Sequence, residues 1–190
     1  MQKGDYLSTI LKSNRTVFTS KDISLLWQSQ STSAARVRMS YYIKKGDLYR
    51  IRKGLYAKSH NYSRLELATK IFVPAYISFE TVLAREGLIF QVYDPIFLAS
   101  YTTRDITIET QIYSYKKLKN EILTNSQGVD ITDEMSIASK ERAFLDTLYT
   151  YNDYHFDNLR SINWDKVYEI LPIYNNQRMA TKVNDLYQTK

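Results

Sequence analysis

The hydrophobic pattern changes its period at Gly46, and this change limits the folds that are open to the chain. Residues 33–45, SAARVRMSYYIKK, consist mostly of good helix formers, and Gly46 suits the C-cap of that helix. Residues 48–52 then alternate, Lys53-Gly54 suits a turn, and residues 55–57 resume the extended pattern. The pattern predicts a helix that is followed at once by a short β-hairpin with a basic turn.

Shorter elements precede this helix. Leucine and isoleucine recur at helical spacing over residues 7–11, the stretch 16–18 is extended, and Thr19 or Ser20 caps a second helix with an apolar face at 23–27. The polar residues 28–33 connect to the third helix, which has its N-cap at Ser31 or Ser33. Helix, strand, helix, turn, helix and basic hairpin is the order of a winged helix-turn-helix. We therefore predict such a domain over residues 1–60, with a polar boundary near 59–63.

A second domain over residues 61–190 is predicted to mix helices and strands. Helices are expected at 63–72, at 79–86 and, after the N-cap Ser139, up to residue 151. Alternation between Ile96 and Tyr115 indicates two to four strands, and the segments around 164–187 have helical spacing, interrupted at Pro172. The chain as a whole is therefore expected to be α+β, with a helical C-terminal end.

Basic residues are concentrated in the first segment. Residues 1–60 hold twelve Lys and Arg against three acidic residues, a formal charge of +9, so that with a total of +6 the rest of the chain carries −3. Such an asymmetry indicates a module for nucleic acid or another anionic surface, joined to a second part.

Composition excludes several classes of protein. The chain has no cysteine, which rules out a disulfide framework, a thiolate nucleophile and a cysteine zinc site. Its first residues lack the apolar stretch of a secretory signal, and no apolar run reaches the roughly 18 residues of a membrane span. We expect a cytoplasmic protein that does not bind membranes.

The third helix is expected to present one face to DNA. At helical spacing Ala35, Met39, Tyr42 and Ile43 form a core stripe, and Arg36 lies on its border. The opposite face suits the major groove, because Ser33 at the helix start can hold a phosphate, a long arginine can reach guanine or phosphate, and valine can meet a thymine methyl. We expect base and phosphate contacts from this helix at the following residues: Ser33, Arg36, Val37, Arg38, Tyr41, Lys44 and Lys45.

The hairpin supplies a second basic element. Arg50, Arg52 and Lys53 cluster at its turn, where they can contact phosphates or the minor groove beside the helix. Together the two elements predict binding to double-stranded DNA, and the alternatives are a solvated basic face or a winged domain that binds a protein.

The sequence predicts no catalytic site, no metal site and no cofactor. His60 and His155 have no companions at ligand spacing, the glycines are scattered singly, and the spacing of Glu109 and Lys116 does not fit a metal-dependent nuclease site. A DNA-acting enzyme is kept as a third hypothesis, which predicts metal-dependent cleavage or modification of duplex DNA.

Two further segments carry a family resemblance. Residues 75–83, AYISFETVL, with Gly87-Leu88, and residues 137–146, IASKERAFLD, resemble the landmark stretches of the AbiE-type (AbiEi family) antitoxins of type IV toxin–antitoxin and abortive infection systems. The hairpin end at 52–56 also resembles the wing of that family. The resemblance covers nearly the whole chain, and one departure is Lys140, where the family often has proline.

The resemblance implies a transcriptional autorepressor that binds inverted repeats in its own promoter and counters a nucleotidyltransferase toxin without a stable complex. Paired half-sites would take two copies of the winged domain, so we expect a monomer or weak dimer that assembles on DNA. A stand-alone transcription regulator whose second domain binds a protein or small ligand is the alternative.

The roles of the charged motif residues in the second domain stay open. Glu80 and Glu141 lie near helix starts, where a carboxylate is favourable, and Arg142 with Asp146 is an i, i+4 pair. Arg142 could equally belong to a functional surface.

Overall fold

A computed structural model describes residues 5–29, 31–132 and 134–188. The chain divides into two compact units, residues 1–71 and residues 72–190. Both units combine helices with a β-sheet, so the predicted α+β class is confirmed.

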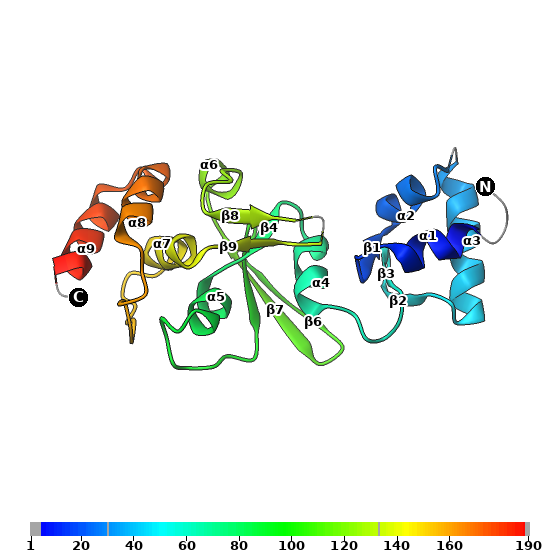
Figure 1. Ribbon diagram of the computed structural model, residues 1–190, viewed down its shortest axis with the longest axis horizontal. Coiled ribbons are helices and arrows are strands. Elements are labelled where there is room, and N and C mark those ends of the chain that lie inside the picture. Colours follow the sequence, from blue (N-terminus) through cyan, green and yellow to red (C-terminus); the bar gives the residue numbers. More distant parts are fainter. Residues whose placement is uncertain (1–4, 30, 133, 189–190) are drawn as a thin grey trace. The chain divides into compact units, whose positions relative to one another are not determined.

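The first three helices of the N-terminal unit lie on one side of a small antiparallel sheet (Figure 1). Along the chain its elements are α1 (Asp5–Lys12), β1 (Val17–Thr19), α2 (Ser20–Leu26), α3 (Thr32–Lys45), β2 (Tyr49–Arg52), β3 (Leu55–Ala57) and α4 (Arg64–Ile71). The strand order is β1-β3-β2, and Val17 and Tyr49 both pair with Ala57 of the central strand. The predicted hairpin is thus present, and β1 adds a third strand to it.

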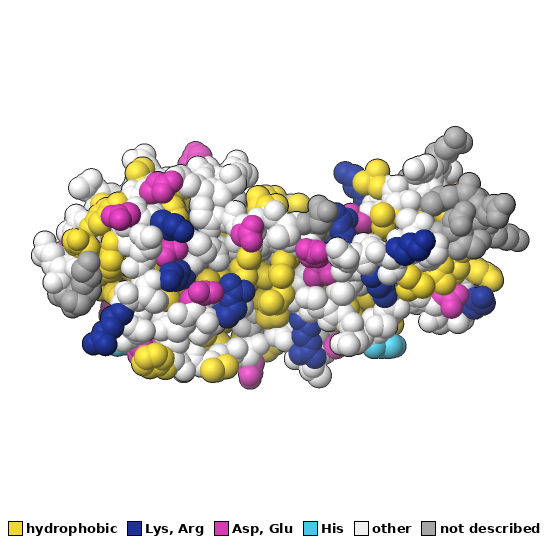
Figure 2. All heavy atoms as spheres, viewed as in Figure 1, with side chains coloured by type: hydrophobic (Ala, Val, Ile, Leu, Met, Phe, Trp, Pro, Cys, Tyr) yellow, Lys and Arg dark blue, Asp and Glu magenta, His cyan; other side chains and the backbone are white. Residues whose placement is uncertain are grey.

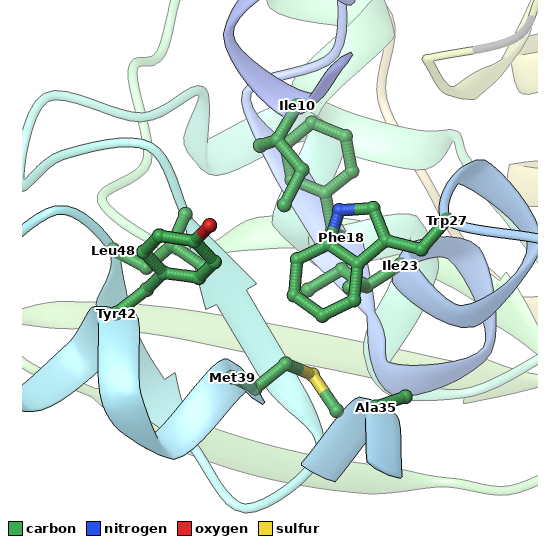
Figure 3. Packing of buried hydrophobic residues seen from close by; sticks show 8 residues of the cluster. All are labelled: Ile10, Phe18, Ile23, Trp27, Ala35, Met39, Tyr42 and Leu48. Carbon is green, nitrogen blue, oxygen red and sulfur yellow. The ribbon is translucent and has the colours of Figure 1, made fainter. Parts of the chain in front are cut away.

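Apolar side chains from the helices and from β1 form the core of this unit (Figure 3). Trp27 and Phe18 lie at its centre beside Met39, and all three are at least 98% buried. The indole nitrogen of Trp27 donates a hydrogen bond to the carbonyl oxygen of Tyr6, 2.7 Å away. The only polar atom of this large side chain is therefore satisfied inside the core.

Helix α4 belongs to the N-terminal unit, although it follows the boundary predicted from the sequence at 60/61. The carboxylate of Glu66 accepts hydrogen bonds from the backbone N–H and the hydroxyl of Thr16, at 2.7 and 2.6 Å. Lys70 lies 3.5 Å from the same carboxylate. The compact units divide at 71/72 because these long-range bonds tie the helix to β1.

A six-stranded mixed sheet organises the second unit (Figure 1). Its elements are β4 (Ala75–Ile77), α5 (Phe79–Arg85), β5 (Ile96–Ser100), β6 (Arg104–Ile108), β7 (Gln111–Lys117), α6 (Asn120–Leu123), β8 (Val129–Ile131), β9 (Ser136–Ala138), α7 (Lys140–Thr150), α8 (Trp164–Ile170), the 3-10 turn η1 (Leu171–Tyr174) and α9 (Gln177–Gln188). The strand order is β6-β7-β5-β4-β9-β8, with parallel pairing of β5 to β7 and of β4 to β9.

Helix α7 forms the centre of the second unit. It packs against α5, against α8 and against strand β9. Every side chain from Glu141 to Leu148 is buried, including three charged ones. A helix that is enclosed in this way is set by tertiary packing, and its charged groups must find partners inside the protein.

No helix in the described part of the chain is both long and apolar enough to cross a membrane.

Candidate nucleic-acid interface

Both ends of helix α3 are fixed by local hydrogen bonds. The Ser31 side chain accepts from the backbone N–H of Ala34 at the N-cap, which selects Ser31 of the two predicted caps and leaves Ser33 in the first turn. Gly46 ends the helix with a left-handed backbone, φ +81°. The helix therefore covers the predicted segment and starts one residue earlier.

One side of α3 is buried as the periodicity predicts. Ala35, Met39 and Tyr42 are buried in the core of the unit, and Ile43 is half-buried at its edge. Of the residues expected to face DNA, six on this helix are exposed: Ser33, Arg36, Val37, Tyr41, Lys44 and Lys45.

The middle of the exposed face is apolar. At about 100° per residue from Met39, Val37 and Tyr41 lie at about 160° and 200°, almost opposite the core. Val37 is 72% exposed and Tyr41 is 57% exposed, and the small Ala34 lies beside them. Figure 2 shows hydrophobic and basic side chains next to one another on the surface of this unit.

The structure holds Arg38 to the side of this face. Its guanidinium lies 3.6 Å from the ring centroid of Tyr6 on α1 and 5.5 Å from that of Trp27, and the residue is half-buried. Arginine stacks well on aromatic faces, so the side chain is kept toward α1. This contact could not be predicted, because helical periodicity does not tell which residue of another helix lies alongside.

A groove separates α1 from α3 along the same face. It is open to solvent, has a volume of about 770 Å³ and is lined mostly by apolar groups of Tyr6 and Leu7 on α1 and of Ala34, Val37 and Tyr41 on α3. Lys45 lies at its end, where its amino group is 3.7 Å from a carboxylate oxygen of Asp47.

The hairpin presents its basic residues to solvent. Arg50, Arg52 and Lys53 are all exposed, and the register shifts between Arg50 and Arg52. The carbonyl oxygen of Gly54 at the turn accepts a hydrogen bond of 3.0 Å from the backbone N–H of Ser20 at the start of α2. This bond anchors the turn to the helical part of the unit while the three cations stay accessible.

The motif residues of the second unit lie inside the protein. Arg142 and Asp146 have no exposed side-chain surface, and their Nε and Oδ1 atoms are 3.3 Å apart, which confirms the predicted i, i+4 pair. The same guanidinium donates to the carbonyl oxygens of Ile122 and Gln127 at 2.6 and 2.8 Å. Arg142 therefore holds the segment around α6, and its side chain has no surface exposed to solvent.

Hydroxyl groups complete the shell around Asp146. Its carboxylate accepts hydrogen bonds from Tyr76 at 3.0 Å, from Ser78 at 2.7 Å and from Tyr174 at 2.7 Å. Burial raises the pKa of Asp146 above its usual range, although Arg142 and the three hydroxyl donors lower it in part. Burial also lowers the pKa of Arg142, but Tyr174, Asp146 and Tyr76 raise it by more, so that the guanidinium stays charged and neutralises the carboxylate.

The two glutamates of the motif are buried as well. Glu141 accepts a hydrogen bond of 3.2 Å from the backbone N–H of Asn163, which is the N-cap residue of α8. Burial raises the pKa of Glu80, and among the described residues its Oε2 atom finds no hydrogen-bond partner. Neither side chain is placed to meet a macromolecule.

The histidines lie apart from these groups. The ring of His60 packs on Tyr49, with centroids 3.8 Å apart, and His155 is exposed near Asp157. Among the residues that the structure describes, no cluster of three or more His, Asp or Glu is arranged to hold a metal ion.

No protein-family model matches the chain, and no curated protein sequence matches it. What the chain does must therefore be inferred from its own residues.

Proposed function

We propose that the N-terminal unit is a winged helix-turn-helix that binds double-stranded DNA, with α3 in the major groove and the β2–β3 hairpin as the wing. The observation that carries this proposal is that the exposed face of α3 and the exposed cations of the hairpin belong to one compact unit. The order of helices and strands in the unit is also the one that this class of domain has.

The basic side chains are suited to phosphates. Lys44 at the end of α3 and Arg50, Arg52 and Lys53 on the hairpin are exposed on long, mobile side chains. Each phosphate that such a cation neutralises makes log K fall by roughly 0.9 for each unit of log salt concentration. Binding should therefore weaken steeply as salt is added.

The experiment that tests DNA binding compares two double variants on duplex DNA from the region upstream of the gene. In a mobility-shift titration at several salt concentrations, Arg52→Ala with Lys53→Ala should lower the affinity and reduce the salt slope by roughly two. The control is Lys166→Ala with Arg178→Ala, because it removes the same charges from exposed positions of the second unit.

The control variant should bind as the wild type does. If the wing variant also binds like the wild type, the hairpin is not a DNA wing. If the wild type binds no duplex at any salt, the unit is a protein-interaction module instead.

We further propose that the protein is an autorepressor and antitoxin of the AbiE type, which would act on its own promoter and against a nucleotidyltransferase toxin. The two stretches that carry the resemblance lie on neighbouring strands, with Ile77 of β4 paired to Ile137 of β9. Side-chain bonds from Tyr76 and Ser78 to Asp146 join them further, which supports their being one structural motif.

Co-expression tests the antitoxin role. Where a nucleotidyltransferase gene adjoins this one, growth inhibited by that enzyme should be restored by the full chain. An isolated gene, or a failure to restore growth by a chain that still binds its promoter, would favour a stand-alone regulator.

A further inference from the structure

The exposed face of α3 holds more apolar surface than a solvated helix needs. Val37 and Tyr41 are one turn apart on the side opposite the core, and both are mostly exposed. Ala34 continues the row toward the helix start, where its small side chain would allow a close approach of the backbone. Such a row suits a partner that offers small apolar groups.

Long hydrogen-bond donors are missing from the middle of this row. Arg38, which would be the natural reader of guanine, is stacked on Tyr6 at 3.6 Å. Lys45 lies beside the carboxylate of Asp47 at 3.7 Å. Of the side chains that remain in the middle, those of Val37 and Ala34 have no polar atoms, and that of Tyr41 has only its phenolic hydroxyl.

The charges around the row indicate the class of partner that it contacts. Lys44 lies on the same helix, and Arg52 and Lys53 lie on the exposed hairpin of the same unit, so the surroundings are basic. An apolar peptide carries no negative charges that would pair with these cations, whereas duplex DNA has phosphates at the edges of its grooves. In the major groove of DNA, the C5-methyl group of thymine is the apolar group that an A·T base pair offers.

We propose that α3 reads DNA through thymine methyl groups, which contact Val37 and Tyr41, and that Arg38 supports the helix from the side without reading a base. This inference rests on the proposed DNA-binding function, and it names the chemical feature that the site recognises. Half-sites bound by this protein should carry thymine where the middle of α3 meets the groove.

The experiment uses the full chain and a duplex selected for tight binding from a library of random sequences. Each thymine of the selected duplex is replaced in turn by deoxyuridine, which removes the methyl group and leaves the hydrogen-bonding edge unchanged. At one or more positions the wild type should lose about fourfold in affinity, the value of one buried methyl group.

Two variants assign the effect to the protein side. Val37→Ala should bind the thymine and deoxyuridine duplexes with nearly equal affinity at the position that Val37 contacts, and Tyr41→Ala should do so at another position. Both residues are exposed, so the variants should unfold at the wild-type temperature. The control is Val92→Ala in the second unit, the same change at a valine that is 86% exposed, which should keep the wild-type difference between the duplexes.

The outcomes separate this inference from the function on which it rests. Salt-dependent, sequence-specific binding that is indifferent to every deoxyuridine would overturn methyl reading and leave DNA binding intact. The inference would also be overturned if Val37→Ala and Tyr41→Ala both kept the wild-type difference in affinity between the thymine and deoxyuridine duplexes. The absence of binding to any duplex would contradict the proposed function itself.

Discussion

Asp146 is the residue on which the interior of the second unit most depends. It accepts hydrogen bonds from four side chains, and one of them is Arg142, a fully buried cation. Replacing Asp146 with asparagine would keep the shape of the side chain but leave the guanidinium without its counter-charge. Breaking a buried ion pair in this way costs roughly 3–5 kcal/mol, because an uncompensated charge remains inside.

We therefore expect Asp146→Asn to lower the free energy of unfolding of the second unit by roughly that amount. Urea denaturation followed by the fluorescence of Trp164 measures it. Glu86→Gln is the matched control, because it removes the carboxylate charge from a solvent-exposed ion pair, in which Nη2 of Arg85 lies 3.1 Å from Oε1 of Glu86. That variant should lose at most about 1 kcal/mol, and an equally small loss for Asp146→Asn would contradict the view of this pair as a structural centre.

At the level of elements, two glycines mark where helix and strand ends need a left-handed backbone. Gly46 ends α3 at φ +81°, with open space where a Cβ would be. Gly128 precedes β8 at φ +72°, and a Cβ there would lie 2.7 Å from Cδ1 of Ile170 and 3.0 Å from Cβ of Arg142. At Gly46 a side chain is disfavoured only by the left-handed backbone. At Gly128 it is disfavoured by the left-handed backbone and also by steric clash with neighbouring atoms.

The two substitutions by alanine should thus differ in cost. Gly46→Ala should destabilise the first unit by about 1–2 kcal/mol, the usual cost of a left-handed residue with a Cβ. Gly128→Ala should cost the second unit about 1–3 kcal/mol more than that, because the buried side chain of Ile170 and Cβ of Arg142 must give way. Thermal unfolding of both variants tests the order, and the reverse order would show that the side chain of Ile170 moves aside easily.

Elements set by local signals could be predicted from the sequence, and elements set by distant partners could not. The periodicity of α3, with serine before it and Gly46 after it, placed that helix to within one residue. Strands β4 and β9 have three residues each and were missed, because their pairing joins Ile77 to Ile137 across much of the second unit. Helix α4 lies beyond the boundary predicted at 60/61, and its attachment to the first unit depends on a contact distant in the sequence, that of Glu66 with Thr16.

The same distinction holds for the candidate interface. The exposed positions of Val37, Tyr41 and the hairpin cations followed from period and turn chemistry alone. The position of the Arg38 side chain depends on where α1 places Tyr6. Local sequence patterns do not predict how α1 lies against α3. Likewise, the spacing of Arg142 and Asp146 indicated a pair, but their complete enclosure follows from the packing of α7 against three neighbouring elements.

At the level of the whole molecule, each unit contains one of the two tryptophans, Trp27 in the first and Trp164 in the second. Single-tryptophan variants, Trp164→Phe and Trp27→Phe, therefore report the unfolding of one unit each. A ligand that binds only the folded state stabilises it by about 2.7 kcal/mol at one hundred times its dissociation constant.

Addition of the selected duplex at that excess should raise the unfolding midpoint reported by Trp27 and leave the midpoint reported by Trp164 unchanged. The measurement is a urea titration with and without DNA at constant salt. An equal rise at both reporters would contradict a DNA surface that is confined to the first unit.

The hydrogen bonds between Glu66 and Thr16 also indicate which part of the chain can be exchanged between proteins as a folded unit. A fusion joined after residue 60 would separate the backbone N–H and the hydroxyl of Thr16 from the carboxylate that accepts from both. A fusion joined after Ile71 would keep all three groups together. Recombination that moves the N-terminal unit between proteins should therefore preserve the hairpin together with the helix that follows it.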